Sequence, residues 1–280
     1  MKSVMTKTLL AAALATAMGA GSTSAVAVLF NPFNVTEASV PGASSNPALL
    51  APFSAGKITG NYSEVGTFNP LTLTTGTFDA SILWNAGQFV APNGSTVLVS
   101  QLGGFTANQY QMYGLVQVSG TYSTIGGKTI STILPGGNLS LFIDPSSNTT
   151  FSAPGSGAGA WTTGLSVDDY LIGTGVNKSG QGTLDPSLPT CLGGGINCGS
   201  FGQTDTLALT ALGKGYFTSP NPFYNLVFTS GQFDLFTPSL TQNIHGSLDA
   251  SFGVPEPESL ALLGIGLLGL GLARRGRKQA

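Results

Sequence analysis

Between residues 28 and 253 the chain repeatedly alternates apolar and polar residues with a period of two. Such alternation over short segments, rich in Val, Ile, Thr and aromatic residues, is typical of β-strands that bury one face. Gly, Asn, Pro and Ser gather between these segments, as expected for turns. The clearest alternating segments are 71–73, 78–82, 96–99, 115–122, 139–143 and 224–228.

The pattern predicts an all-β domain over residues 28–253, arranged as an antiparallel β-sandwich-like fold. No segment in this range keeps a helical period for more than about two turns. A β-solenoid is the alternative, but the chain has no fixed repeat period. Residues 152–160 are of low complexity, and we interpret them as a loop rather than a linker between two sub-lobes.

Residues 1–27 form a predicted signal peptide. Lys2 and Lys7 precede an apolar stretch at residues 9–18, and Ala25 and Ala27 fit the small-x-small cleavage pattern. A second cleavage site, ending at Ala25, fits the same pattern. Export implies an oxidising compartment.

Residues 254–280 differ from the rest of the chain. Pro255, Glu256 and Pro257 disfavour helix, and the uncharged residues 259–273 that follow predict a membrane helix. Such a helix is about 22 Å long and contains several glycines, so we expect a transient anchor. A basic stop with a cytoplasmic location follows it, at Arg274, Arg275, Arg277 and Lys278.

This three-part C-terminus resembles the PEP-CTERM sorting signal, which implies recognition and processing by an exosortase, a membrane protease. The domain also resembles the flocculation-associated PEP-CTERM proteins of the PepA type. That resemblance implies a role in floc formation through extracellular polysaccharide, and it assigns no functional residues beyond the sorting motif. It rests on residues 30–35, 58–64, 222–224, 230–233 and 246–249.

Only 8% of the residues are charged. Residues 28–253 contain four lysines, no arginine and ten acids, a net charge of −6. Because nucleic-acid binding requires clustered basic residues, this composition excludes it. Neutral polar groups keep such a chain in solution, and we expect weak electrostatic steering.

Cys191 and Cys198 are the only cysteines, and three of the residues between them are glycines. In an exported protein this spacing predicts a disulfide, since a metal site would need further ligands. The single histidine, His245, has no nucleophile or orienting acid nearby in sequence, so we interpret it as a polar strand residue.

Two acidic segments merit comparison with known sites. Asp144, Ser146 and Asn148 have the 1-3-5 oxygen spacing of a Ca²⁺ loop, without its glycine or final glutamate. Asp168 and Asp169 have the chemistry of a glycosidase pair, but sequence does not place two acids in space. We expect a turn and surface acids respectively, with no metal and no cofactor.

The expected function is that of a non-enzymatic matrix protein, exported through the inner membrane and active at the cell surface or beyond, in flocs or biofilm. The alternatives are a carbohydrate-binding module and a secreted carbohydrate-active enzyme. A ring of Trp and Tyr around a cleft would favour binding, and two close carboxylates in it would favour the enzyme. The chain has only Trp84 and Trp161, which weakens both alternatives.

Overall fold

A computed structural model describes residues 31–42, 51–103, 109–192, 197–220 and 225–253. The predicted signal peptide, and the sorting segment with its helix and basic stop, lie outside the described residues. Within the described part, no helix is long and apolar enough to cross a membrane.

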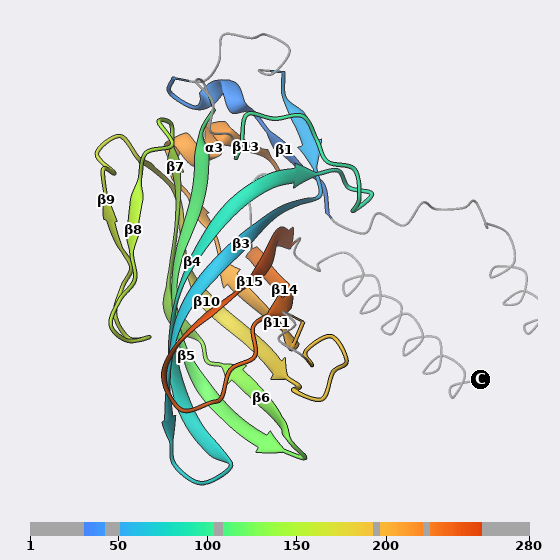
Figure 1. Cartoon of the computed structure of the whole chain (residues 1–280). Coiled ribbons are helices and arrows are strands. Elements are labelled where there is room, and N and C mark those ends of the chain that lie inside the picture. Colours follow the sequence, from blue (N-terminus) through green and yellow to red (C-terminus); the bar gives the residue numbers. More distant parts are fainter. Residues whose placement is uncertain (1–30, 43–50, 104–108, 193–196, 221–224, 254–280) are drawn as a thin grey trace, which may run out of the picture.

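Strands are the dominant secondary structure of the described residues and the helices there are short, so the prediction of an all-β domain is confirmed (Figure 1). The first strands are β1 (Phe33–Val35), β2 (Phe53–Ala55), β3 (Lys57–Pro70), β4 (Thr75–Val90), β5 (Gln111–Ile125), β6 (Lys128–Ile133), β7 (Gly136–Asp144), β8 (Thr150–Ser152) and β9 (Thr162–Gly164). Then follow β10 (Tyr170–Leu184), β11 (Gly199–Thr206), β12 (Ala208–Leu209), β13 (Phe217–Ser219), β14 (Asn225–Phe233) and β15 (Leu240–Gly253). The helices are the 3₁₀-helix η1 (Glu37–Ser39) and α3 (Ala211–Tyr216).

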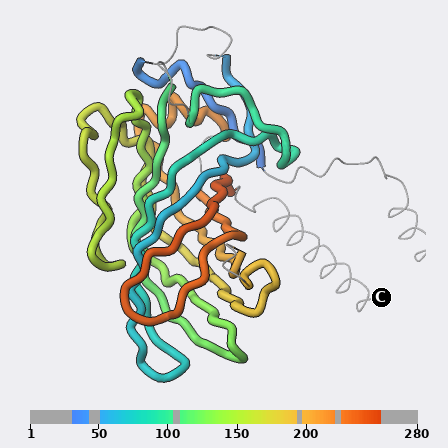
Figure 2. Tube along the Cα trace, viewed as in Figure 1, coloured from blue at the N-terminus to red at the C-terminus, as the bar shows by residue number. Residues whose placement is uncertain are grey.

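The main sheet is antiparallel and closes on itself. Its order runs β11-β14-β15-β3-β4-β5, then through β6 and β7 to β10, and β10 pairs with β11. The consecutive strands β6 and β7 both lie between β5 and β10, so together they occupy one position in the ring. The consecutive strands β11 and β12 both pair with β10, so they too occupy one position. The result is a ring of eight strand positions, and the long strands curve around it in the tube view (Figure 2).

This closure corrects the predicted sandwich, which would require two separate sheets packed face to face. Alternation with period two indicates a buried face in either architecture, so it does not distinguish them. The deciding contact is the pairing of Asn177–Leu184 in β10 with Gly199–Asp205 in β11, which seals the ring. That pairing depends on distant parts of the chain, which local pattern does not report.

Large aromatic side chains fill the interior where glycines stand opposite them. Phe78 of β4 faces Gly120 of β5, and a Cβ added to Gly120 would lie 2.4 Å from the Phe78 ring. Tyr62 of β3 faces Gly246 of β15 in the same way, and a Cβ added to Gly246 would lie 2.7 Å from the Tyr62 ring. Each glycine therefore provides the space that the neighbouring ring occupies.

One end of the ring is closed by a buried carboxyl group. Glu37 of η1 is fully buried and accepts hydrogen bonds from the Tyr110 hydroxyl (2.7 Å) and the Gln101 backbone N–H (3.0 Å). The Tyr110 hydroxyl also bonds that of Tyr216, at the end of α3. Burial raises the pKa of Glu37, although these hydrogen bonds act to lower it. In Figure 1 this closed end is the upper one, where β1, α3 and β13 gather.

Two predicted strand segments are wrong. Residues 71–73 form the β3–β4 hairpin, with Leu71 73% exposed and Leu73 fully exposed. Residues 96–99 form no strand beyond one isolated bridge at Val97. Both segments alternate correctly but lie outside the sheet, because a strand requires paired neighbours as well as a pattern. The other segments contribute to β4, β5, β7 and β14.

Residues 152–160 connect β8 to β9 as a loop that packs on the outside of the ring. The Gly157 backbone N–H donates to the Thr67 hydroxyl (2.9 Å), and the Ala158 carbonyl accepts from Gln117 (3.3 Å). The loop thus covers part of the outer face formed by β3, β4 and β5.

The structure joins Cys191 and Cys198 by a disulfide, with their Cα atoms 4.6 Å apart and both residues buried. Closing a loop this short stabilises a fold by about 2–3 kcal/mol at most. We therefore expect the double Cys→Ser variant to fold, with a free energy of unfolding reduced by no more than about 3 kcal/mol. Urea denaturation followed by circular dichroism measures this, and an unfolded variant in the absence of urea would contradict it.

Candidate functional site

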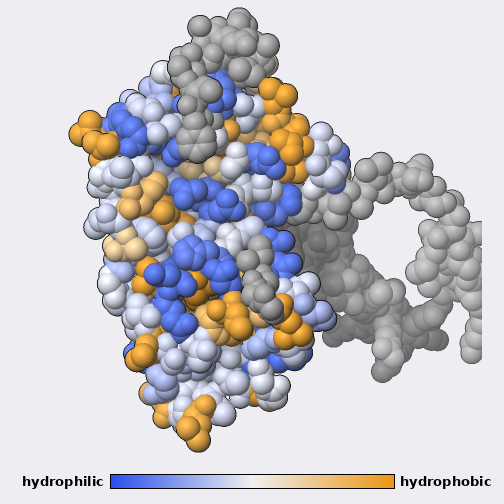
Figure 3. Space-filling model, viewed as in Figure 1, coloured by the Kyte–Doolittle hydropathy of each residue, from blue (hydrophilic) through white to orange (hydrophobic). Residues whose placement is uncertain are grey.

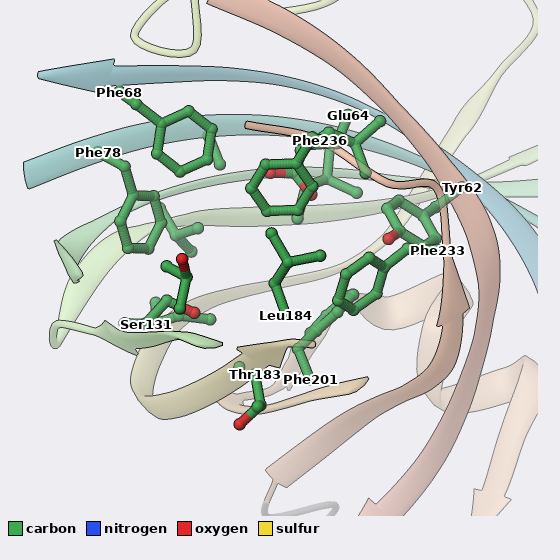
Figure 4. A pocket seen from close by; sticks show the side chains of 17 residues that line it. Tyr62, Glu64, Phe68, Phe78, Ser131, Thr183, Leu184, Phe201, Phe233 and Phe236 are labelled. Carbon is green, nitrogen blue, oxygen red and sulfur yellow. The ribbon is translucent and has the colours of Figure 1, made fainter. Parts of the chain in front are cut away.

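The interior of the ring contains a chamber of about 70 Å³. Its walls come from β3, β4, β5, β6, β10, β11, β14 and β15, so residues far apart in sequence meet there. Figure 4 shows aromatic rings from opposite sides of the ring converging on it. The phenylalanines in its lining are Phe68, Phe78, Phe201, Phe233 and Phe236.

Glu64 places a carboxyl group among these apolar side chains (Figure 4). It lies on β3, where Tyr62, Glu64 and Phe68 share the inward face, and it pairs in register with Ile82 of β4 and Ile244 of β15. Among the described residues its side chain has neither a hydrogen-bond partner nor an ion-pair partner. Burial raises the pKa of Glu64 from 4.5 to about 7.

A wider opening of about 560 Å³ leads toward this chamber. Thr129, Leu184 and Phe236 line both spaces, which makes them the boundary between the opening and the interior. The opening lies at the end opposite Glu37, among the β3–β4 and β5–β6 hairpins and the loop before β15. The exposed Leu73 and Leu235 stand at its edge, and the lower tip of the molecule is orange in Figure 3.

The fold brings together the two acidic segments that the sequence analysis treated separately. Carboxylate oxygens of Asp144, Asp168 and Asp169 lie within 4.8 Å of one another. Asp144 is buried at the end of β7, and the other two are half-buried before β10. Carboxylate oxygens are ligands that Ca²⁺ accepts, and two carboxylates are also what a glycosidase uses.

Hydrogen bonds within the protein already engage each of these carboxylates. Asp144 accepts from the backbone N–H groups of Ser146 (3.0 Å) and Thr149 (2.9 Å). Asp169 accepts from the Thr149 hydroxyl (2.9 Å) and the Tyr113 hydroxyl (2.5 Å), and Asp168 accepts from Ser146. These bonds organise the turn after β7, as expected from the sequence, and they bind it to the segment before β10.

The remaining candidates lie apart from both sites. His245 of β15 is 60% exposed, with its Nδ1 3.3 Å from a carboxylate oxygen of Asp234. Trp84 is buried and donates to the Leu248 carbonyl (3.0 Å), while half-buried Trp161 donates to the Ser81 carbonyl (3.0 Å). Neither tryptophan therefore offers a fully exposed ring to a sugar.

Sequence reasoning missed Glu64. The available signal was its position two residues from Tyr62 and four from Phe68, which gives all three the same face of a strand. A carboxyl in that phase belongs to the buried face, where an acid is uncommon without a partner.

The two inward carboxyls predict that acid stabilises the domain. Burial raises the pKa of Glu64 to about 7 and that of Asp205 to about 6, so both groups bind protons more tightly when folded. The free energy of unfolding therefore falls as the pH rises through these pKa values. Glu64 accounts for up to about 3 kcal/mol of this fall.

We expect the free energy of unfolding to fall between pH 5 and pH 8, and Glu64→Gln to remove about half of that fall. Urea titrations across this range measure both effects. A domain that is as stable at pH 8 as at pH 5 would contradict the placement of these carboxyls.

Comparisons with known proteins identify the C-terminal segment. A family model described as the PEP-CTERM protein-sorting motif matches residues 253–278. Neither the search of curated proteins nor that of solved structures found a match. The motif implies processing by an exosortase, export, and a place at the cell surface or outside the cell. The chain therefore carries a PEP-CTERM sorting motif at residues 253–278, which supports an exported protein that is a substrate of an exosortase.

Proposed function

We propose that the exported domain promotes floc formation by associating with extracellular polysaccharide, without catalysing a reaction. The supporting observation is a row of uncharged polar side chains on the outer face of the ring. In register across five neighbouring strands, this row consists of Asn69, Thr77, Thr121, Thr132 and Gln181. We call it the polar row.

The polar row suits weak contact with an extended sugar chain. Its members are exposed except Thr77, which is half-buried. Since neighbouring strands lie about 4.8 Å apart, five strands span about 19 Å. Each hydroxyl or amide exchanges a hydrogen bond with a sugar for about 1 kcal/mol net, so many such contacts must act together.

A secreted carbohydrate-active enzyme is the second candidate, because Asp144, Asp168 and Asp169 meet in space. The hydrogen bonds from Ser146 and Thr149 give these acids a role in binding two loops together. Substitution of single acids distinguishes an enzyme from an adhesion protein. Loss of one catalytic carboxylate abolishes catalysis, whereas multivalent adhesion survives the loss of one side chain.

The first test adds purified processed protein to cells that lack the gene and scores aggregation. We expect the wild-type protein to restore flocs at low and high salt alike, because few charges take part. The variants Asp168→Ala, Asp169→Ala and His245→Ala should each restore them equally. If any one of these fails while remaining folded, a discrete active site exists and the enzyme becomes the better explanation.

The polar row itself is tested by the triple variant Thr121→Ala, Thr132→Ala and Gln181→Ala. We expect retention on the cells' own polysaccharide to fall at least about tenfold, because three hydrogen bonds of about 1 kcal/mol each are lost. The matched control removes three exposed hydroxyls outside the row, with Thr74→Ala, Thr174→Ala and Thr218→Ala. Equal retention of the two triple variants would refute a role for the row.

Release of the domain depends on the sorting motif. Proline keeps the backbone extended, and an extended segment leaves main-chain groups free to pair with a protease cleft. We expect replacement of Pro255, Glu256 and Pro257 by alanines to leave the protein in the membrane fraction, while Glu258→Ala is released as usual. Immunoblots of membrane and medium decide this, and normal release of the triple variant would show that another segment is the signal.

A further inference from the structure

The chamber inside the ring has a composition that selects the charge of its contents. Its lining combines five phenylalanine rings with one acid, Glu64, and includes no lysine, arginine or histidine. Aromatic faces carry negative potential and attract cations. A cationic group is therefore favoured by both components of the lining, and an anionic group by neither.

Within the described part of the chain, the carboxyl of Glu64 has no hydrogen-bond or ion-pair partner in this chamber. Its cross-strand neighbours are Ile82 and Ile244, which offer no hydrogen bonds. Tyr62, on the same strand face, is the other titratable residue of the lining. Glu64 is half-buried among apolar side chains, where a carboxyl without a protein partner costs free energy, and a ligand that supplies a donor recovers it.

We propose that this chamber binds a small apolar molecule that carries one amine group, with the ammonium at Glu64 and the hydrocarbon among the phenylalanine rings. This site is separate from the polar row, since its residues face the inside of the ring. It does not depend on binding of polysaccharide.

The dimensions of the site set the size and the orientation of the ligand. A water molecule needs about 10–15 Å³ of such space, so the chamber of about 70 Å³ holds a group of a few non-hydrogen atoms, such as one small ring. Glu64 lies four residues along β3 from Phe68, about 13 Å further from the opening. The amine therefore enters first, and any longer tail lies toward Leu184 and Phe236 at the boundary with the opening.

The surroundings of Glu64 make amine binding depend on pH. From β4 and β15 it faces isoleucines, and from the loop before β15 it faces Phe236. Tyr62 is the other titratable group of the lining, and burial raises its pKa, so it stays neutral. Asp234, which precedes that loop segment, lies beside His245, with 3.3 Å between its carboxylate oxygen and the histidine Nδ1. Since the pKa of Glu64 is about 7, the carboxylate that attracts an ammonium is present at pH 8 and mostly absent at pH 5.5.

The experiment compares three probes that share a benzyl group and differ in charge, on processed protein purified from the medium. The probes are benzylamine (cationic), benzyl alcohol (neutral) and phenylacetate (anionic), titrated at pH 8 and followed by ligand-observed NMR. We expect benzylamine to bind at least about tenfold more tightly than benzyl alcohol, with no detectable binding of phenylacetate. At pH 5.5 the affinity for benzylamine should fall at least about tenfold, while that for benzyl alcohol stays the same.

Two variants locate the effect. Glu64→Gln should reduce the preference for benzylamine over benzyl alcohol to less than about threefold. Asp79→Asn is the matched control, because it removes a carboxylate from the outward face of β4 and should leave the preference unchanged. Equal affinity of the wild-type protein for the amine and the alcohol overturns the proposed ligand class. Absence of binding by all three probes overturns the site, whether or not the variants fold.

Discussion

The interior of a closed eight-stranded sheet is narrow, and the rest of this structure depends on how aromatic side chains fit into it. Phe78 and Tyr62 fit because Gly120 and Gly246 stand opposite them and leave their side of the ring empty. Tyr122 has the same relation to Gly76, whose added Cβ would lie 2.6 Å from the ring. Large residues facing small ones on adjacent strands fill a core without overpacking it. Glycines in the described strands therefore serve the core as well as the turns.

The same arrangement separates a sealed end from an open one, and two glutamates show the difference. Glu37 is fully buried, but the hydroxyl of Tyr110 and the N–H of Gln101 satisfy its carboxyl, so it holds the cap in place. Glu64 lies among phenylalanines and isoleucines that offer no donor. A satisfied buried carboxyl stabilises a structure, whereas an unsatisfied one beside a cavity is poised for an external partner. The two glutamates differ because the elements around Glu37 supply hydrogen-bond donors and the elements around Glu64 do not.

Local pattern therefore predicts the strands better than it predicts their assembly. The alternation at residues 78–82, 115–122 and 139–143 correctly indicates β4, β5 and β7, because burial of one face acts along a single strand. Closure of the ring rests on β10 pairing with β11, which no local pattern encodes. For the same reason Asp144 and Asp168 are recognisable singly, while their meeting is a property of the fold. The sorting motif is different, because its signal lies in consecutive residues, and sequence alone identifies it.

The distribution of charge follows from these two environments. Outside the ring, the polar row meets water with hydroxyl and amide groups, so each contact is weak and nearly independent of salt. Inside, the chamber lining is mostly apolar, and its one carboxyl, Glu64, exerts a strong effect because an apolar surrounding screens charge poorly. A chain with so few charges can therefore combine many weak contacts on its surface with one selective contact in its interior. At the interior contact a small change in ligand chemistry has a large energetic consequence, since an amine pairs with Glu64 and an acid is repelled by it.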